Sequence, residues 1–168
     1  RPFPPGHWEG DLIVGPHNRS AIATLVERPT RSLSLLKMKT FTSAALYDAL
    51  VAWSKTLPAS LRQTLFWDQG KEMSKHLDNT ATTSITIYFC DRASPWQRAT
   101  NENTNGLLRQ YFPKSADLGK YSQSDLARVQ QELNQRPHRA LGNKTPAELF
   151  QALLASNTET PVATTTGT

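Results

Sequence analysis

The sequence has 168 residues, a length that suits one domain with a complete hydrophobic core and is too short for two. No segment approaches the roughly 18 consecutive apolar residues of a membrane span, and residues 1–6 lack the apolar core of a signal peptide. The single cysteine, Cys90, excludes an internal disulfide and a multi-cysteine zinc site. We therefore expect one soluble domain located in the cytoplasm.

The basic charge is concentrated in one segment. The chain has 19 Lys and Arg residues and 14 Asp and Glu residues, a formal net charge of +5. Residues 92–144 contain nine of the basic residues and four of the acidic ones, so this segment carries the whole excess. A basic surface attracts polyanions, which makes nucleic acid the first partner to test, although many proteins of this charge never bind DNA.

The first part of the chain predicts three antiparallel strands. Residues 8–14, 20–27 and 32–39 are rich in apolar and β-branched side chains, and glycine or proline residues separate them. Such closely spaced strands indicate a three-stranded meander.

The rest of the chain predicts alternating helices and strands. Residues 41–57 have apolar side chains at helical spacing, with Thr42 or Ser43 available as the N-cap. Two further strands are expected over 63–68 and 85–91. A helix of about ten residues is expected from 71, a second over 99–112 that Pro113 ends, a third over 122–133, and a short one from 145. This order indicates an α/β fold in which a mixed five-stranded sheet is covered by helices on both faces.

Composition divides the chain into three expected segments. Residues 1–6 are rich in proline and are interpreted as the remnant of a linker. Residues 7–154 are expected to form the folded core. Residues 155–168 are low in apolar side chains and predict a disordered tail.

Acidic residues recur at the ends of the predicted strands. Asp11, Asp68 and Asp91 occupy such positions, and Glu102 lies on a predicted helix. Sites in open α/β sheets form at the carboxyl ends of strands. Three carboxylates that converge there could bind a pair of divalent cations, but the spacing of these acids is weak evidence by itself, because solvated acids and helix caps are more common.

The predicted helix around Glu102 has a polar, basic row. At 100° per residue, Arg98, Asn105 and Arg109 fall within about 60° of Glu102. Donors beside a metal-binding acid would suit a phosphate backbone. An exposed helix with an ion pair between Arg98 and Glu102 would show the same row.

Several long motifs in this order resemble one family. The motifs GHWEGDLIVG, TLVERPTR, WDQGKEM, YFCD, SPWQRATNENTNGLLRQYFPK and ELNQRPHRALGNKTPAE resemble the catalytic, integrase-core domain of the bacterial insertion sequence 30 family transposases, over about residues 3–150. The resemblance implies an RNase H-like fold of the retroviral-integrase type. It also implies a DDE triad of Asp11, Asp68 and Glu102 that binds two Mg²⁺ or Mn²⁺ ions, with a basic residue seven positions after the glutamate, here Arg109.

The resemblance further implies a reaction and partners. A transposase of this kind would cleave the ends of its element and transfer the 3′-hydroxyl to target DNA, within a homo-oligomeric complex. Its terminal repeats would be recognised by an N-terminal helix-turn-helix region outside this sequence. Two alternatives keep the fold, a non-catalytic DNA-binding or assembly module and an RNase H-like nuclease that stops at hydrolysis.

Other residues carry more than one interpretation. Trp96 could stack on an unpaired base or anchor its loop, and Lys114 would join the basic residues that position DNA. Glu72 and His76 could bind a metal at i,i+4 spacing, although a structural role is favoured. Asp91 is interpreted as a loop acid rather than a fourth ligand.

Two acids lie close together in the first strand. Glu9 and Asp11 share one face of this strand because side chains alternate. The family motif selects Asp11 as the ligand and leaves Glu9 as a second-shell or surface acid.

Overall fold

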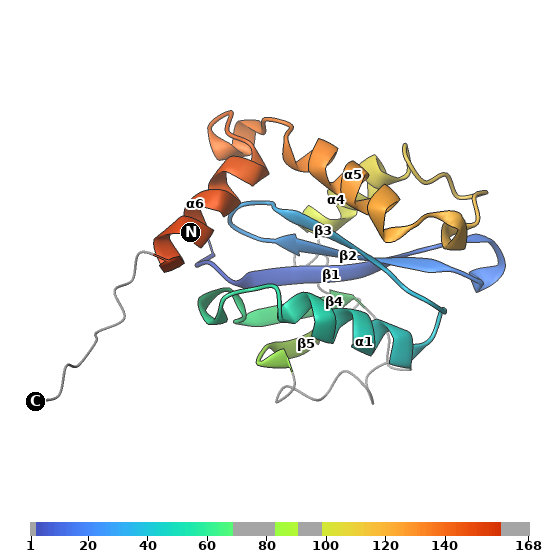
Figure 1. Ribbon diagram of the computed structural model, residues 1–168. Coiled ribbons are helices and arrows are strands. Elements are labelled where there is room, and N and C mark those ends of the chain that lie inside the picture. Colours follow the sequence, from blue (N-terminus) through green and yellow to red (C-terminus); the bar gives the residue numbers. More distant parts are fainter. Residues whose placement is uncertain (1–2, 69–82, 91–98, 159–168) are drawn as a thin grey trace, which may run out of the picture.

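The computed structural model describes residues 3–68, 83–90 and 99–158. Five strands form one sheet in the order β3-β2-β1-β4-β5, as Figure 1 shows. These strands are β1 (His7–Val14), β2 (Ala21–Glu27), β3 (Leu33–Lys37), β4 (Thr64–Asp68) and β5 (Thr86–Cys90). β1 pairs antiparallel with β2, and β2 pairs antiparallel with β3. β4 runs parallel to both β1 and β5, so the sheet is mixed, as the sequence predicts.

Helices cover both faces of this sheet. Helix α1 (Ser43–Ser54) lies on one face, while α4 (Ala99–Leu108) and α5 (Gln123–Asn134) lie on the other (Figure 1). Helix α1 begins after Thr42, whose side chain accepts a hydrogen bond from the backbone N–H of Ala45. The predicted α/β class and RNase H-like architecture are therefore confirmed.

The buried apolar residues form two cores separated by the sheet. One core lies beneath α1 and includes Trp8, Leu50, Trp53 and Trp67. The other lies beneath α4 and α5 and combines sheet residues such as Ile13 with helical residues; its helical or loop members include Leu108, Phe112, Leu126 and Leu133. This two-sided burial follows from the alternation of side chains along each strand.

Helix α5 also covers the free edge of β3. The amide side chains of Gln123, Gln130 and Asn134 accept hydrogen bonds from the backbone N–H groups of Lys37, Leu35 and Leu33, at 2.9, 2.8 and 2.8 Å. Gln123 and Asn134 also donate to the carbonyls of Leu35 and Leu33. The backbone groups of this edge strand are thus satisfied without another strand, which prevents edge-to-edge pairing.

Two helix boundaries differ from those expected. Helix α4 ends at Leu108 rather than continuing to 112, because the backbone N–H groups of Gln110 and Tyr111 bond to carbonyls three residues back. This tight turn directs Phe112 into the core, where it is 1% exposed.

The last helix, α6 (Pro146–Thr158), is longer than the short helix predicted, so residues 155–158 are helical where a disordered tail was expected. Its apolar residues pack on the core, and Phe150 contacts the ring of Trp8 with 5.9 Å between centroids. The helix predicted from residue 71 lies outside the described residues.

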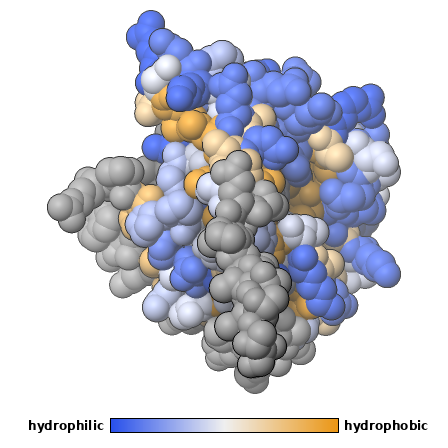
Figure 2. Space-filling model, turned by 60° about the vertical axis from the view of Figure 1, so that its left-hand side comes forward, coloured by the Kyte–Doolittle hydropathy of each residue, from blue (hydrophilic) through white to orange (hydrophobic). Residues whose placement is uncertain are grey.

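The surface seen in Figure 2 is mainly hydrophilic, with smaller apolar areas between polar side chains. Among the described residues, no helix combines the length and the hydropathy that crossing a membrane requires.

Candidate active site

Strand β1 directs two acids to the same face of the sheet. Trp8 and Leu12 pack in the core beneath α1, whereas Ile13 belongs to the core beneath α4 and α5. Because side chains alternate, Glu9 and Asp11 lie on the α4 side with Ile13. The structure therefore confirms that the two acids share one face, and their contacts distinguish them.

The carboxylate of Asp11 is held at both oxygens. Its Oδ1 accepts a hydrogen bond of 2.7 Å from the backbone N–H of Leu12, and its Oδ2 accepts one of 2.7 Å from Nδ2 of Asn105. Hydrogen bonds to a carboxylate are among the stronger ones in proteins, at about 1.5–3 kcal/mol each. Asp11 is only half-buried, so its carboxylate remains close to solvent while its orientation is fixed.

Asn105 connects helix α4 to two strands. Besides donating to Asp11, its Oδ1 lies 3.4 Å from the hydroxyl of Thr24 on β2. That hydroxyl also lies 3.2 Å from the carbonyl of Asp11, opposite which Thr24 is paired in the sheet. The amide of Asn105, predicted as a DNA contact, thus contacts the candidate ligand itself in this structure.

The backbone brings Asp68 and Glu102 to the same region. Asp68 is the last residue of β4 and follows Trp67, which pairs with Gly10 of β1, the residue before Asp11. Glu102 lies three residues before Asn105 on α4, which is about one helical turn. The three predicted acids therefore lie on β1, on its parallel neighbour β4 and on α4, which packs on β1 and β2.

Arg109 makes main-chain contacts just after α4. Its guanidinium donates to the carbonyl of Val14 at 3.1 Å, with a longer contact of 3.5 Å to the carbonyl of Phe112. Partial burial lowers the pKa of Arg109 below its ordinary value. Arg109 thereby fastens the end of α4 to the end of β1, and its role in DNA binding stays a prediction.

The other predicted DNA contacts are less informative. Lys114 is exposed in the loop after α4. Trp96, Arg98 and Asp91 lie outside the described residues, as do Glu72 and His76.

Glu9 has a different environment from Asp11. It is 4% exposed, and its Oε1 lies 3.0 Å from the guanidinium of Arg28. That guanidinium also lies over the rings of Phe3 and Phe66, at 4.2 and 4.6 Å from their centroids. The interpretation of Glu9 as a surface acid is therefore wrong, because burial requires the compensation that Arg28 supplies.

Sequence reasoning missed Thr24 and Arg28. Thr24 stands inside an otherwise apolar strand and is fully buried, and a polar residue in such a run is a signal for a hydrogen-bond partner. Arg28 directly follows β2, but its partner Glu9 is distant in sequence and becomes a neighbour only when β1 pairs with β2.

The donor set at Asp11 suits a hard divalent cation. Mg²⁺ and Mn²⁺ prefer carboxylate oxygens, and the three predicted residues are all carboxylates. Each carboxylate oxygen has two lone-pair directions, so the hydrogen bonds from Leu12 and Asn105 are compatible with metal coordination and would orient the group for it.

Together, the mixed five-stranded sheet and the helices on both of its faces define an RNase H-like domain. No protein-family model matches the chain. The transposase for insertion sequence element IS1086 of Cupriavidus metallidurans is 48% identical over 155 residues, which are 92% of this chain and 46% of that relative. The transposase InsI for insertion sequence element IS30C of Escherichia coli is 49% identical over 146 residues, 87% of this chain and 38% of that relative.

A more distant relative agrees with these two. The transposase for insertion sequence element IS4351 of Bacteroides fragilis is 34% identical over 90% of this chain and 46% of its own length. The chain belongs to the insertion sequence 30 family of transposases, and it spans less than half the length of these relatives.

Proposed function

We propose that this chain is the catalytic part of a DDE-type DNA transposase. Asp11, Asp68 and Glu102 would bind two Mg²⁺ or Mn²⁺ ions, and the DNA strands would approach along the α4 side of the sheet. The observation that carries the proposal is the carboxylate of Asp11, which is held by Asn105 from the helix that carries Glu102 and lies beside the end of β4.

The proposed chemistry consists of two in-line displacements at phosphorus. Water attacks a phosphodiester at the element end, the bond from phosphorus to the 3′ oxygen breaks, and a 3′-hydroxyl is released. That hydroxyl then attacks a target phosphodiester, and the 3′ oxygen of the target strand leaves. Two bound cations would neutralise charge on the attacking and leaving oxygens.

The chain's own residues would keep this site in order. Leu12 and Asn105 hold the Asp11 carboxylate in one orientation, so binding a metal requires little reorganisation. Thr24 orients Asn105 in turn. Arg98, Arg109, Lys114 and Trp96 would contact the DNA near the site, and the active complex would be a homo-oligomer on the terminal repeats and the target.

The decisive experiment is a strand-transfer assay with the full-length protein, Mn²⁺ and DNA that carries an element end. Asp11→Asn and Asp68→Asn should each abolish joined products. Asp48→Asn is a matched control, because Asp48 is exposed on α1, across the sheet from the proposed site. Equal product from the wild type and Asp68→Asn would overturn the catalytic proposal and favour a non-catalytic DNA-binding module.

The same assay separates a transposase from a nuclease. Joined products support strand transfer, whereas nicked DNA without joined products would indicate an RNase H-like nuclease that stops at hydrolysis.

Asn105 has a separate test as a positioning residue. Asn105→Ala should raise the Mn²⁺ concentration needed for half-maximal activity, because the Asp11 carboxylate loses a donor that orients it. A role in stability alone would lower the unfolding temperature without changing that Mn²⁺ concentration.

A further inference from the structure

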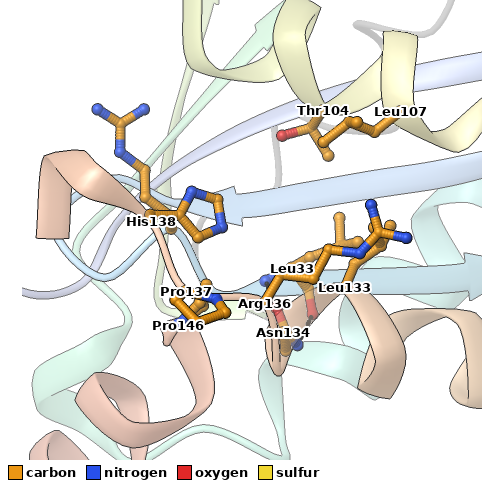
Figure 3. A pocket seen from close by; sticks show the side chains of 10 residues that line it. Leu33, Thr104, Leu107, Leu133, Asn134, Arg136, Pro137, His138 and Pro146 are labelled. Atoms are coloured by element: carbon orange, nitrogen blue, oxygen red, sulfur yellow. Dashed lines mark hydrogen bonds between the residues drawn. The ribbon is translucent and has the colours of Figure 1, made fainter. Parts of the chain in front are cut away.

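A second candidate site lies on the other flank of α4. A pocket of 210 Å³ opens between α4, the start of β3 and the end of α5. Figure 3 shows Thr104 and Leu107 of α4 facing Leu33, Leu133 and His138 across this pocket. The pocket therefore adjoins α4, the helix whose Asn105 bonds to Asp11, but it is lined by residues that are not part of the proposed active site.

The pocket has apolar walls that also carry basic residues. Its apolar lining consists of leucine and proline side chains from both sides, namely Leu33, Leu107, Leu133, Pro137 and Pro146. Arg31, Arg136 and His138 are its ionisable residues, and the described residues that line it include no acid.

The two arginines come from separate segments, and each is held by hydrogen bonds. Arg31 lies in the turn between β2 and β3 with φ of +62°, and its backbone N–H bonds to the carbonyl of Glu27 at 2.8 Å. Arg136 follows α5 and donates to the hydroxyl of Tyr111 at 2.6 Å, while Glu132 lies 3.8 Å away. Arg136 is therefore oriented by neighbours and still 44% exposed at its side chain.

The loop after Arg136 is also ordered and basic. His138 and Lys144 form an isolated antiparallel bridge, with the backbone N–H of His138 donating to the carbonyl of Lys144 at 3.0 Å. Asn143 returns a bond of 2.9 Å to the carbonyl of His138, and Gly142 takes the left-handed conformation that turns the chain. These hydrogen bonds hold the backbone of the loop from which its basic side chains extend.

The pKa of His138, in the wall of the pocket, is affected by the neighbouring positive charge. The pKa of His138 is lowered from 6.5, first by burial and then by the charge of Arg31. At neutral pH this imidazole therefore offers a neutral donor or acceptor at the pocket wall, while the arginines supply the charge.

From this arrangement we infer that the pocket binds one nucleotide unit of a DNA strand, with Arg31 and Arg136 contacting the phosphates on either side of this unit and its sugar lying against the leucine and proline side chains. The inference rests on the proposed function, because a strand that reacts at Asp11 must continue past α4. Arginine side chains suit phosphate oxygens, and apolar pocket walls suit the carbon atoms of deoxyribose better than a free anion.

The test measures binding of a short fluorescent DNA duplex of arbitrary sequence to the full-length protein across a series of salt concentrations, without divalent metal. Arg31→Gln combined with Arg136→Gln should weaken binding severalfold and reduce the slope of log affinity against log salt by about two. Arg128→Gln is the matched control, because Arg128 is 76% exposed, pairs with Asp125 and does not line the pocket. The control should keep the wild-type slope.

A charge-conserving variant controls for a loss of DNA binding that is caused by misfolding. Arg31→Lys combined with Arg136→Lys should restore most of the slope, and all variants are compared by thermal unfolding. If the double glutamine variant binds DNA with the slope of Arg128→Gln, the inference is overturned, and an acidic protein segment becomes the better occupant. Strand transfer by the wild type in that case would leave the proposed function intact, whereas no transfer by the wild type would refute the proposed function separately.

Discussion

The buried pair of Glu9 and Arg28 gives the sharpest prediction about stability. Glu9→Gln removes the negative charge and leaves the guanidinium of Arg28, only 9% exposed at its side chain, without a compensating carboxylate. Removing one partner of a buried pair typically costs about 3–5 kcal/mol. The rings of Phe3 and Phe66 still contact the cation, so we expect the lower end, about 3 kcal/mol.

Urea unfolding of this chain, followed by tryptophan fluorescence, measures the effect directly. In a thermal scan the same loss corresponds to a decrease of about 6–12 °C in Tm for a protein of this size. Glu132→Gln is the matched control, since Glu132 also faces an arginine but is 58% exposed, and we expect a change below about 1 kcal/mol.

The result that refutes this reasoning is a loss for Glu9→Gln no larger than that of the control. The pair would then be so well solvated that its charge needs no partner. Below its unfolding temperature, Glu9→Gln should retain strand transfer where Asp11→Asn does not, because Glu9 is occupied by Arg28 whereas Asp11 is the proposed ligand.

Two further predictions follow from the same strands and from the basic pocket. Gly10→Ala should lower the free energy of unfolding in urea by about 1–3 kcal/mol, because the added Cβ would lie 2.4 Å from the ring of the buried Trp67. An unchanged unfolding midpoint would contradict the packing described. The pKa of His138, followed by NMR, should lie below 6.5 and rise in Arg31→Gln without fully returning, since burial is the larger cause. Because the unfolded chain binds this proton more readily, His138 should lower stability as the pH falls through about 6.5 and below, and a pKa above that value would contradict the burial described.

Local patterns in the sequence were sufficient for most of the fold. The apolar, β-branched runs predicted the strands to within a few residues, and Thr42, one of the two caps expected, does cap α1. These features depend on neighbours in the chain, which is why they can be read without a structure. The early end of α4 could not, since it depends on Phe112 reaching the second core.

Helix α5 shows how a pattern can mislead. Gln123, Gln130 and Asn134 are spaced by seven and four residues, so they form one polar stripe, which is normally interpreted as a solvent-facing surface. In the structure this stripe bonds to the edge of β3. Only the sheet order, with β3 at an edge, gives those amides a partner.

The proposed site, too, was only partly predictable from the sequence. The family motif selects Asp11, Asp68 and Glu102, but the contacts of Asn105 and Thr24 with Asp11 depend on how α4 crosses β1 and β2. The spacing of Glu102 and Asn105 on one helical face was visible in advance and pointed to DNA. The structure adds that Asn105 reaches the acid on the strand below.

Three consecutive residues of β1 each have a distinct structural role. Glu9 balances the buried Arg28, Gly10 leaves room for the ring of Trp67, and Asp11 receives Asn105 from α4. The glycine matters for the proposed site because close contact of β1 with β4 sets the register in which Gly10 pairs with Trp67, the residues that precede Asp11 and Asp68. A larger residue there would therefore disturb the geometry of two proposed ligands through packing alone, without touching either carboxylate.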